Sequence, residues 1–166
     1  MTEYLGICLH LEGQQGSQYA HYNFNSLCRF AGMNLGANDN GIFKLDDGDL
    51  DYSAPDTSAE IDAFVELPTS DWGIANQKRI RSAHLGIETN GELLLTLTDD
   101  EGIDYRYDVV PDFVANKQHS VRVTAGRNNG KGRYWRIRLD NINGADFSLN
   151  NLRVFPVVLG PRPARS

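Results

Sequence analysis

The sequence predicts an all-β protein, namely an antiparallel β-sandwich or jelly-roll-like domain preceded by a short β-meander. Apolar and polar residues alternate with a period of two in many short segments, and no segment shows helical periodicity. The 16 glycines among 166 residues indicate frequent tight turns. A chain of this length buries about two-thirds of its unfolded surface, so its core needs no disulfide framework or structural metal. The two cysteines, Cys8 and Cys28, are therefore expected to be reduced and buried.

Residues 1–52 are predicted to form the β-meander, packed on the main domain. Strands are expected at "YLGICLHLE", "SLCRFAG", "MNLGAN" and "GIFKLD", with turns at Gly32 and at "NDNG". The following segment, residues 46–60, is acidic, contains Pro55 and lacks periodicity. It is therefore predicted to be a loop or linker that separates the two parts of the chain.

The sandwich is predicted over residues 60–160, with about seven strands. The first strand is expected to end at Pro68 and to place on one face Ile61, Ala63, Val65 and Leu67. Asn90 and Gly91 suit a type I′ turn, which predicts a hairpin between the strands of Leu85 and Ile87 and of Leu93, Leu95 and Leu97. Alternation predicts further strands with these core-facing residues: Tyr105, Tyr107 and Val109; Val121 and Val123; Trp135, Ile137 and Leu139; Phe147 and Leu149.

No motif in the chain predicts catalysis, a cofactor or a metal. "GRNNGKG" lacks the spacing and the Ser or Thr of a phosphate-binding loop, and its expected role is a turn between strands. The acidic run at Asp46, Asp47, Asp49 and Asp51 lacks the glycine and the final acidic residue of a calcium loop. The four histidines are too scattered for a zinc site. Neither enzyme activity nor a small-molecule substrate is expected, although a spatial pair of carboxylates for glycoside hydrolysis stays open.

Two features bear on location and on sugar binding. The N-terminal "MTEYLGICLHLEG" is unlike a signal peptide, and no apolar stretch reaches the roughly 20 residues of a membrane span, so synthesis in the cytoplasm without membrane insertion is expected. Exposed aromatic residues such as Trp72 and Tyr134 could stack on sugars, but a tryptophan in a β protein usually packs in the core.

Charge is distributed unevenly along the chain. Residues 117–166 hold ten Lys and Arg against two Asp, a net charge of +8, whereas residues 1–116 carry −14. Such a division permits nucleic-acid binding, contact between acidic and basic faces of neighbouring copies, or simple mixing of charges on one folded surface. Arg136 and Arg138 share one face of a strand that begins near Arg133, and ion pairs with Asp104 and Asp108 are expected. The acidic segment makes nucleic acid an improbable partner.

The segment "GKGRYWRIRLDNINGADFSLNNLRVFPVVLGPR", together with "FNSLCRFAGMNLGANDNGIFKLD", "DWGIANQKRIRSAHLGIETNGELLLTL" and "DYRYDV", resembles virion-associated structural proteins of tailed bacteriophages. The resemblance runs from about residue 24 to residue 162, and its most specific part reaches from "RYW" to "PVVL". It implies a non-enzymatic virion component, expected in the tail, tail tip or baseplate, that assembles with copies of itself and with other phage structural proteins. The alternatives are a carbohydrate-binding module that contacts the host surface and a head or collar decoration protein.

The candidate interface residues are the basic ones of the C-terminal region: Arg133, Arg136, Arg138, Arg162 and Arg165. Residues 161–166 contain Pro163 and two arginines with little to bury, so an extended C-terminal arm is expected. An arm of this length reaches at most about 25 Å, which is enough to lie on an adjacent subunit. Arg162 and Arg165 would then meet carboxylates of that neighbour.

Deletion of residues 160–166 tests this role of the arm. The truncated chain is expected to fold and to assemble poorly, with an altered dependence on salt, because the ion pairs of the two arginines are lost. Light scattering across a series of ionic strengths measures the effect. Unchanged assembly at every ionic strength would show that the arm has no such role.

Overall fold

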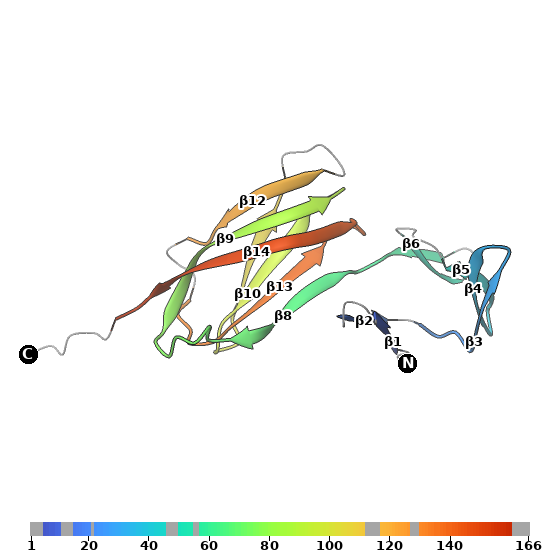
Figure 1. The fold of residues 1–166 in the computed structure, drawn as a ribbon, viewed down its shortest axis with the longest axis horizontal. Helices are drawn as coiled ribbons and strands as arrows, with labels where there is room; N and C mark the ends of the chain where they lie inside the picture. Colours follow the sequence, from blue (N-terminus) through green and yellow to red (C-terminus); the bar gives the residue numbers. More distant parts are fainter. Residues whose placement is uncertain are drawn as a thin grey trace, which may run out of the picture. The chain divides into compact units, whose positions relative to one another are not determined.

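The computed structural model describes residues 5–10, 15–20, 22–45, 50–54, 57–111, 117–126 and 130–160. Every regular element in these ranges is a β-strand, and all strand pairs are antiparallel (Figure 1). The prediction of an all-β protein is confirmed. The chain divides into two compact units, Met1–Gly48 and Asp49–Ser166, close to the predicted boundary.

The first unit contains two small sheets. One pairs β1 (Leu5–His10) with β2 (Gln15–Ala20), and the other has the order β3 (Ser26–Phe30), β4 (Met33–Asn38) and β5 (Gly41–Leu45). The β3–β4–β5 sheet contains three of the four strands predicted for the meander, whereas the strand at "YLGICLHLE" lies in the other sheet. The turn between β3 and β4 uses Ala31 and Gly32, whose φ angles are 48° and 83°. β2 was not predicted, because "QGSQYA" has no alternation of apolar residues.

A row of aromatic rings connects the two sheets of this unit. The rings of Tyr19, Tyr22, Phe24 and Phe43 follow one another with centroids 5.1 to 6.1 Å apart. Gly36 makes room for one of them, since a Cβ at this position would lie 2.7 Å from the Phe24 ring. Cys8 and Cys28 are exposed, so the prediction that both are buried is wrong. Both lie on strands of sheets so small that they bury little beyond these rings.

The acidic segment contains a hairpin rather than a continuous loop. β6 (Leu50–Ala54) pairs with β7 (Thr57–Glu60), with a register shift between Tyr52 and Ala54. The prediction of a loop over residues 46–60 is therefore wrong for these strands. Alternation of apolar and polar residues indicates that one face of a strand is buried, whereas backbone hydrogen bonds between strands need no apolar pattern. Asp46, Asp47 and Asp49 lie outside the described residues.

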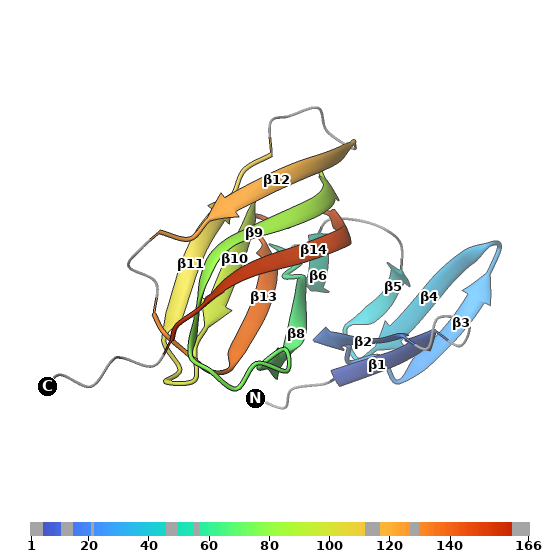
Figure 2. The ribbon, with the colours of Figure 1, turned by 60° about the vertical axis from the view of Figure 1, so that its left-hand side comes forward.

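Seven strands form the sandwich of the second unit. The four-stranded sheet has the order β11 (Asp104–Val109), β10 (Leu93–Thr98), β13 (Trp135–Asn141) and β8 (Phe64–Ser70). The three-stranded sheet has the order β12 (Gln118–Thr124), β9 (Lys78–Thr89) and β14 (Phe147–Val158). Figure 2 shows the two sheets stacked on each other.

The predicted hairpin at Asn90–Gly91 is wrong. β9 and β10 belong to different sheets, and neither turn residue has a positive φ. Asn90 instead exchanges hydrogen bonds with Asp146, whose amide nitrogen donates to the Asn90 side-chain oxygen over 2.9 Å. The two positive φ angles of a type I′ turn occur at Asn143 and Gly144, with values of 54° and 68°.

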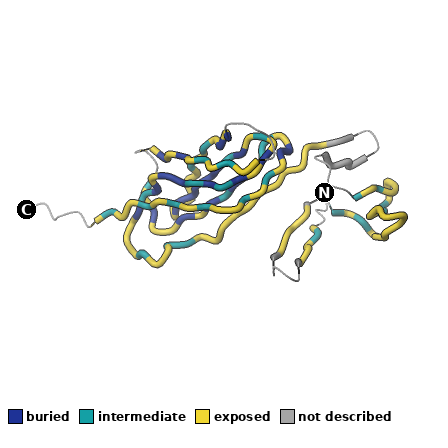
Figure 3. Tube along the Cα trace, turned by 45° about the horizontal axis from the view of Figure 1, so that its top comes forward, coloured by how far each residue is buried: buried dark blue, intermediate teal, exposed yellow. Residues whose placement is uncertain are grey.

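The core lies between the two sheets and consists of the predicted alternating residues (Figure 3). Leu85, Ile87, Leu93, Leu95, Leu97, Val109, Val123, Ile137 and Leu139 are buried. Trp135 is 1% exposed, and its indole nitrogen donates to the carbonyl oxygen of Gly132 over 3.3 Å. The predicted inward orientation of Trp135, Ile137 and Leu139 is confirmed.

Strand β8 differs from its prediction. Pro68 lies within this strand instead of ending it, beside a register shift between β8 and β13. An edge strand with a bulge tolerates proline, which has no N–H to donate. Val65 and Leu67, which were expected to face the core, are 38% and 39% exposed.

Replacement of Trp135 by alanine is expected to lower the free energy of unfolding by about 3 to 5 kcal/mol, because it empties a large volume at the centre of the core. Denaturant titration measures the loss. Replacement of the exposed Tyr134 by alanine is the control and should change stability little. An unchanged stability of the Trp135→Ala variant would contradict the burial of the ring.

Candidate functional site

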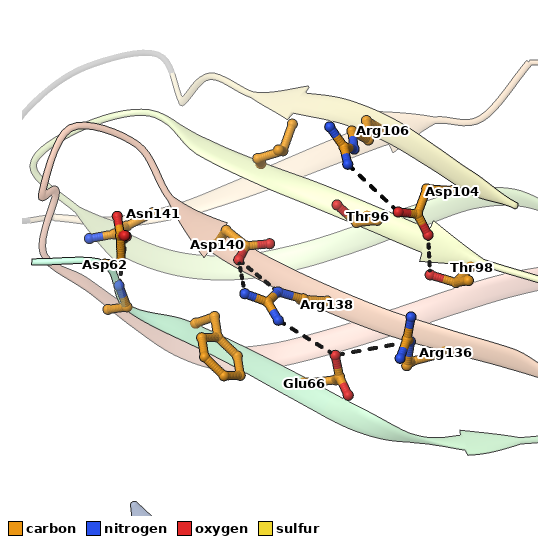
Figure 4. Close-up of a pocket in the computed structure, with 13 residues that line it drawn as sticks. Asp62, Glu66, Thr96, Thr98, Asp104, Arg106, Arg136, Arg138, Asp140 and Asn141 are labelled. Atoms are coloured by element: carbon orange, nitrogen blue, oxygen red, sulfur yellow. Dashed lines mark hydrogen bonds and ion pairs between the residues drawn. The ribbon is translucent and has the colours of Figure 1, made fainter. Parts of the chain in front are cut away.

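The outer face of the four-stranded sheet contains a shallow depression of about 530 Å³. Its floor is strand β10, with Thr96 and Thr98, and its walls come from β8, β11 and β13 (Figure 4). Threonine is short, whereas arginine side chains on both neighbouring strands are long. The depression therefore follows from side-chain length along three adjacent strands.

Cross-strand register sets the positions of the charges. Thr96 lies opposite Arg106 on β11 and opposite Arg138 on β13. Thr98 lies opposite Asp104 and Arg136 in the same way, and its hydroxyl donates to Asp104 over 2.8 Å. Positive and negative side chains are consequently mixed on this face.

Arg138 has the most contacts in the depression. Its Nε and one terminal nitrogen each lie 2.7 Å from Asp140 Oδ1, and its other terminal nitrogen lies 3.8 Å from Glu66. Its guanidinium carbon is 3.8 Å from the centroid of the Phe64 ring, a cation–π contact. Arg136 approaches the same Glu66 at 4.0 Å.

The predicted ion pairs of Arg136 and Arg138 with Asp104 and Asp108 are wrong. Strand β10 separates β11 from β13, so these side chains do not face each other across adjacent strands. Asp104 instead lies 3.7 Å from Arg106 on its own strand. Exposed ion pairs stabilise a fold by at most about 1 kcal/mol, so this charge pattern contributes little to stability.

The other candidate interface residues are not in the depression. Arg133 is exposed beside Tyr134, with its guanidinium 5.8 Å from that ring. Its backbone nitrogen donates to Asp100 over 3.0 Å. Arg162 and Arg165 lie outside the described residues. Of the five candidates, the depression contains only Arg136 and Arg138. Arg106 also lines the depression, although it was not among the candidate interface residues.

The segment "GKG" that precedes Arg133 has a structural role. A Cβ on Gly130 would lie 2.6 Å from Asp99 Oδ2 and still closer to the Tyr105 hydroxyl, and one on Gly132 would lie 2.8 Å from Asp100. The Tyr105 hydroxyl donates to Asp99 over 3.0 Å. Burial first, and then this hydrogen bond, raise the pKa of Tyr105 above its usual value. Tyr105 is therefore a neutral donor at physiological pH.

A buried lysine, Lys78, was missed by the sequence analysis. Its backbone pairs with Gly132 through hydrogen bonds of 2.8 and 3.1 Å, and its amine donates to the carbonyl oxygens of Ile74 and Arg133. The amine also lies 5.7 Å from the Trp72 ring. Lys78 is two residues before the buried Ile80, so the two side chains lie on the same face of β9. This spacing was the sequence signal for the burial of Lys78. Trp72, expected in the core, is 37% exposed.

The lining of the depression suits contact with a protein surface of mixed charge. Phe64 is its only aromatic residue, and Arg138 covers that ring. Within the described residues, no group of three or more His, Cys, Asp or Glu is arranged to hold a metal ion. The described part of the chain also has no helix that could cross a membrane.

Comparison of the chain with protein-family models found no match, and neither the curated proteins nor the solved structures gave one. The fold and the side-chain geometry described above therefore carry the functional argument, together with the sequence resemblance.

Replacement of Gly130 by alanine is expected to lower the free energy of unfolding by about 1 to 3 kcal/mol, since the added methyl group overlaps Tyr105 and Asp99. In a Tyr105→Phe background the same replacement should cost less, because the nearest atom is gone. Gly126→Ala is the matched control, with no atom within 4 Å of its Cβ. Equal costs in both backgrounds, measured by denaturant titration, would contradict this packing.

Proposed function

We propose that this protein is a structural component of a tailed bacteriophage virion, placed in the tail, tail tip or baseplate, and that it acts through protein–protein assembly. The observation that carries the proposal is the resemblance of "GKGRYW" and the segment up to "PVVL" to virion-associated structural proteins. Its partners are copies of itself and other phage structural proteins. The protein is made in the host cytoplasm and incorporated into the particle without catalysing a reaction.

The roles of the motif residues support this proposal. Gly132 and Trp135 join the Lys78 backbone to the core, and Gly130 packs against Tyr105. A motif whose residues build a fold is typical of a scaffold rather than of a reactive centre. The mixed charges around Arg136 and Arg138 are also suited to fixing the orientation of a partner.

A carbohydrate-binding module is the rival function. Such a module stacks sugar rings on exposed aromatic side chains. The depression offers one aromatic ring, Phe64, which is 52% exposed but has the Arg138 guanidinium 3.8 Å from its centroid. Trp72 and Tyr134 are 37% and 42% exposed outside the depression. Binding to host-surface glycans that Trp72→Ala abolishes would favour this rival over an assembly role.

Purification of intact particles tests the proposed function. The chain is expected to remain with the particles through a density gradient at a constant ratio to the other structural proteins. Gold-labelled antibodies against the chain should mark the tail. Labelling of the head or collar would favour a decoration protein, and a chain present in the lysate but missing from particles would contradict the proposal.

A further inference from the structure

The two sheets of the sandwich differ by one strand, and the extra strand is β8. β11 and β12 come into contact at one side of the sandwich. When the strands of each sheet are counted from that side, β10 has the same position as β9, and β13 has the same position as β14. The three-stranded sheet has no strand at the position of β8. Within the described part of the chain, no strand pairs with the outer backbone edge of β8 or of β14, and these two edges form the open side of the sandwich.

Exposed apolar side chains mark this open side. Val65 and Leu67 of β8 pair with Leu139 and Ile137 of β13. The two residues of β13 are 2% and 4% exposed, whereas those of β8 are 38% and 39% exposed. On β14, Val158 lies opposite the buried Lys78 and is 45% exposed. An eighth strand beside β14 would cover these side chains.

Both strands are also available for pairing. β8 and β14 are each the last strand of their sheet in the described residues, so each has one unpaired backbone edge. β14 is twelve residues long, which makes this edge one of the longest in the molecule. Edge strands with a free backbone and an apolar face accept a further strand.

Charge distinguishes the two edges. The stretch 60–71, which contains β8, has four carboxylates and no Lys or Arg: Glu60, Asp62, Glu66 and Asp71. The single charged residue of β14 is Arg153. Glu66 and Arg153 lie on the outer faces of their sheets, opposite Arg138 and His84 respectively. The stretch that contains β8 is therefore acidic and β14 is basic, and Glu66 also lies 4.0 and 3.8 Å from Arg136 and Arg138 of the adjacent strand.

We propose that a second copy of this chain closes the open side, with β8 of each copy beside β14 of the other. A two-fold axis parallel to the strands brings the three-stranded sheet of one copy into line with the four-stranded sheet of the other. Both gaps are then filled at once, and each combined sheet has seven strands. The contact is self-complementary and closed, as expected for a symmetric dimer.

Strand direction fixes the type of pairing. β8 and β14 both run opposite to β13 (Figure 1). A two-fold axis along the strands preserves their directions, so β8 meets the β14 of the second copy in parallel. Glu66 of one copy and Arg153 of the other then project from the same outer face of a combined sheet.

This inference rests on the proposed assembly function and names one surface for it. The two fail separately, because the inference is tested on the purified full-length chain and the function on the particle. A dimer of this kind in a chain that is missing from particles would contradict the function alone.

Sedimentation equilibrium of the full-length chain tests the dimer. Wild type is expected to be dimeric. Leu67→Glu and Arg153→Glu should each raise the dissociation constant about tenfold or more, since each removes a contact of the shared edge. The matched controls lie at the opposite side of the sandwich. Val110→Glu replaces another exposed apolar residue. Arg122 on β12 and Arg153 on β14 both lie opposite His84 of β9, so Arg122→Glu makes the same charge change at the other edge of the sheet. Both controls should remain dimeric.

A charge exchange supplies the second test. Glu66→Arg should weaken the dimer as Arg153→Glu does, and the variant with both changes should recover most of the wild-type affinity. Near-ultraviolet circular dichroism of the buried Trp135 shows whether each variant is folded. A wild type that stays monomeric at all concentrations would overturn the proposal. So would an oligomer that Arg122→Glu weakens as strongly as Arg153→Glu, or a charge exchange without recovery among folded variants.

Discussion

The contact of Gly132 with Lys78 and Trp135 is the constraint on which the rest of the sandwich depends. Lys78 begins β9 in one sheet, and Trp135 begins β13 in the other. The backbone of Gly132 pairs with Lys78, and its carbonyl oxygen also accepts the indole N–H of Trp135. This single residue therefore joins both sheets at the point where the largest core side chain enters. A Cβ at Gly132 would lie 2.8 Å from Asp100 Oδ1 and 3.1 Å from the carbonyl oxygen of Tyr134, so these groups would have to move.

The order of the strands in the four-stranded sheet determines which charges pair on its outer face. Because β13 lies between β10 and β8, its arginines meet Glu66 on one side and the short threonines on the other. Short side chains on β10 leave the depression, and long ones on β13 and β11 bound it. This face is consequently hydrated and polar, whereas the opposite face of the same strands is the dry core. Its position on a rigid sheet makes it suitable for oriented contact with a partner.

Unequal sheets account for the partial exposure of Val65 and Leu67 on β8. A three-stranded sheet covers three strands of its neighbour, so the inner side chains of β8 stay partly exposed even though the alternation of that strand is correct. The bulge at Pro68 bends this strand and removes one backbone donor, a feature typical of sheet edges. The second copy that we propose would cover these side chains without a change in the fold of either chain.

The sequence by itself determined which residues face the core, because alternation is a property of each strand alone. Leu93, Trp135 and Ile137 are examples. Tertiary structure alone decided which strands meet. Asn90 and Gly91 carry the chain between sheets, and Arg138 pairs with Asp140 and Glu66 rather than with Asp108. The same holds for the exposed cysteines. Strand pairing joins residues far apart in the chain, and its free energy depends on all strands together, so no local pattern encodes it.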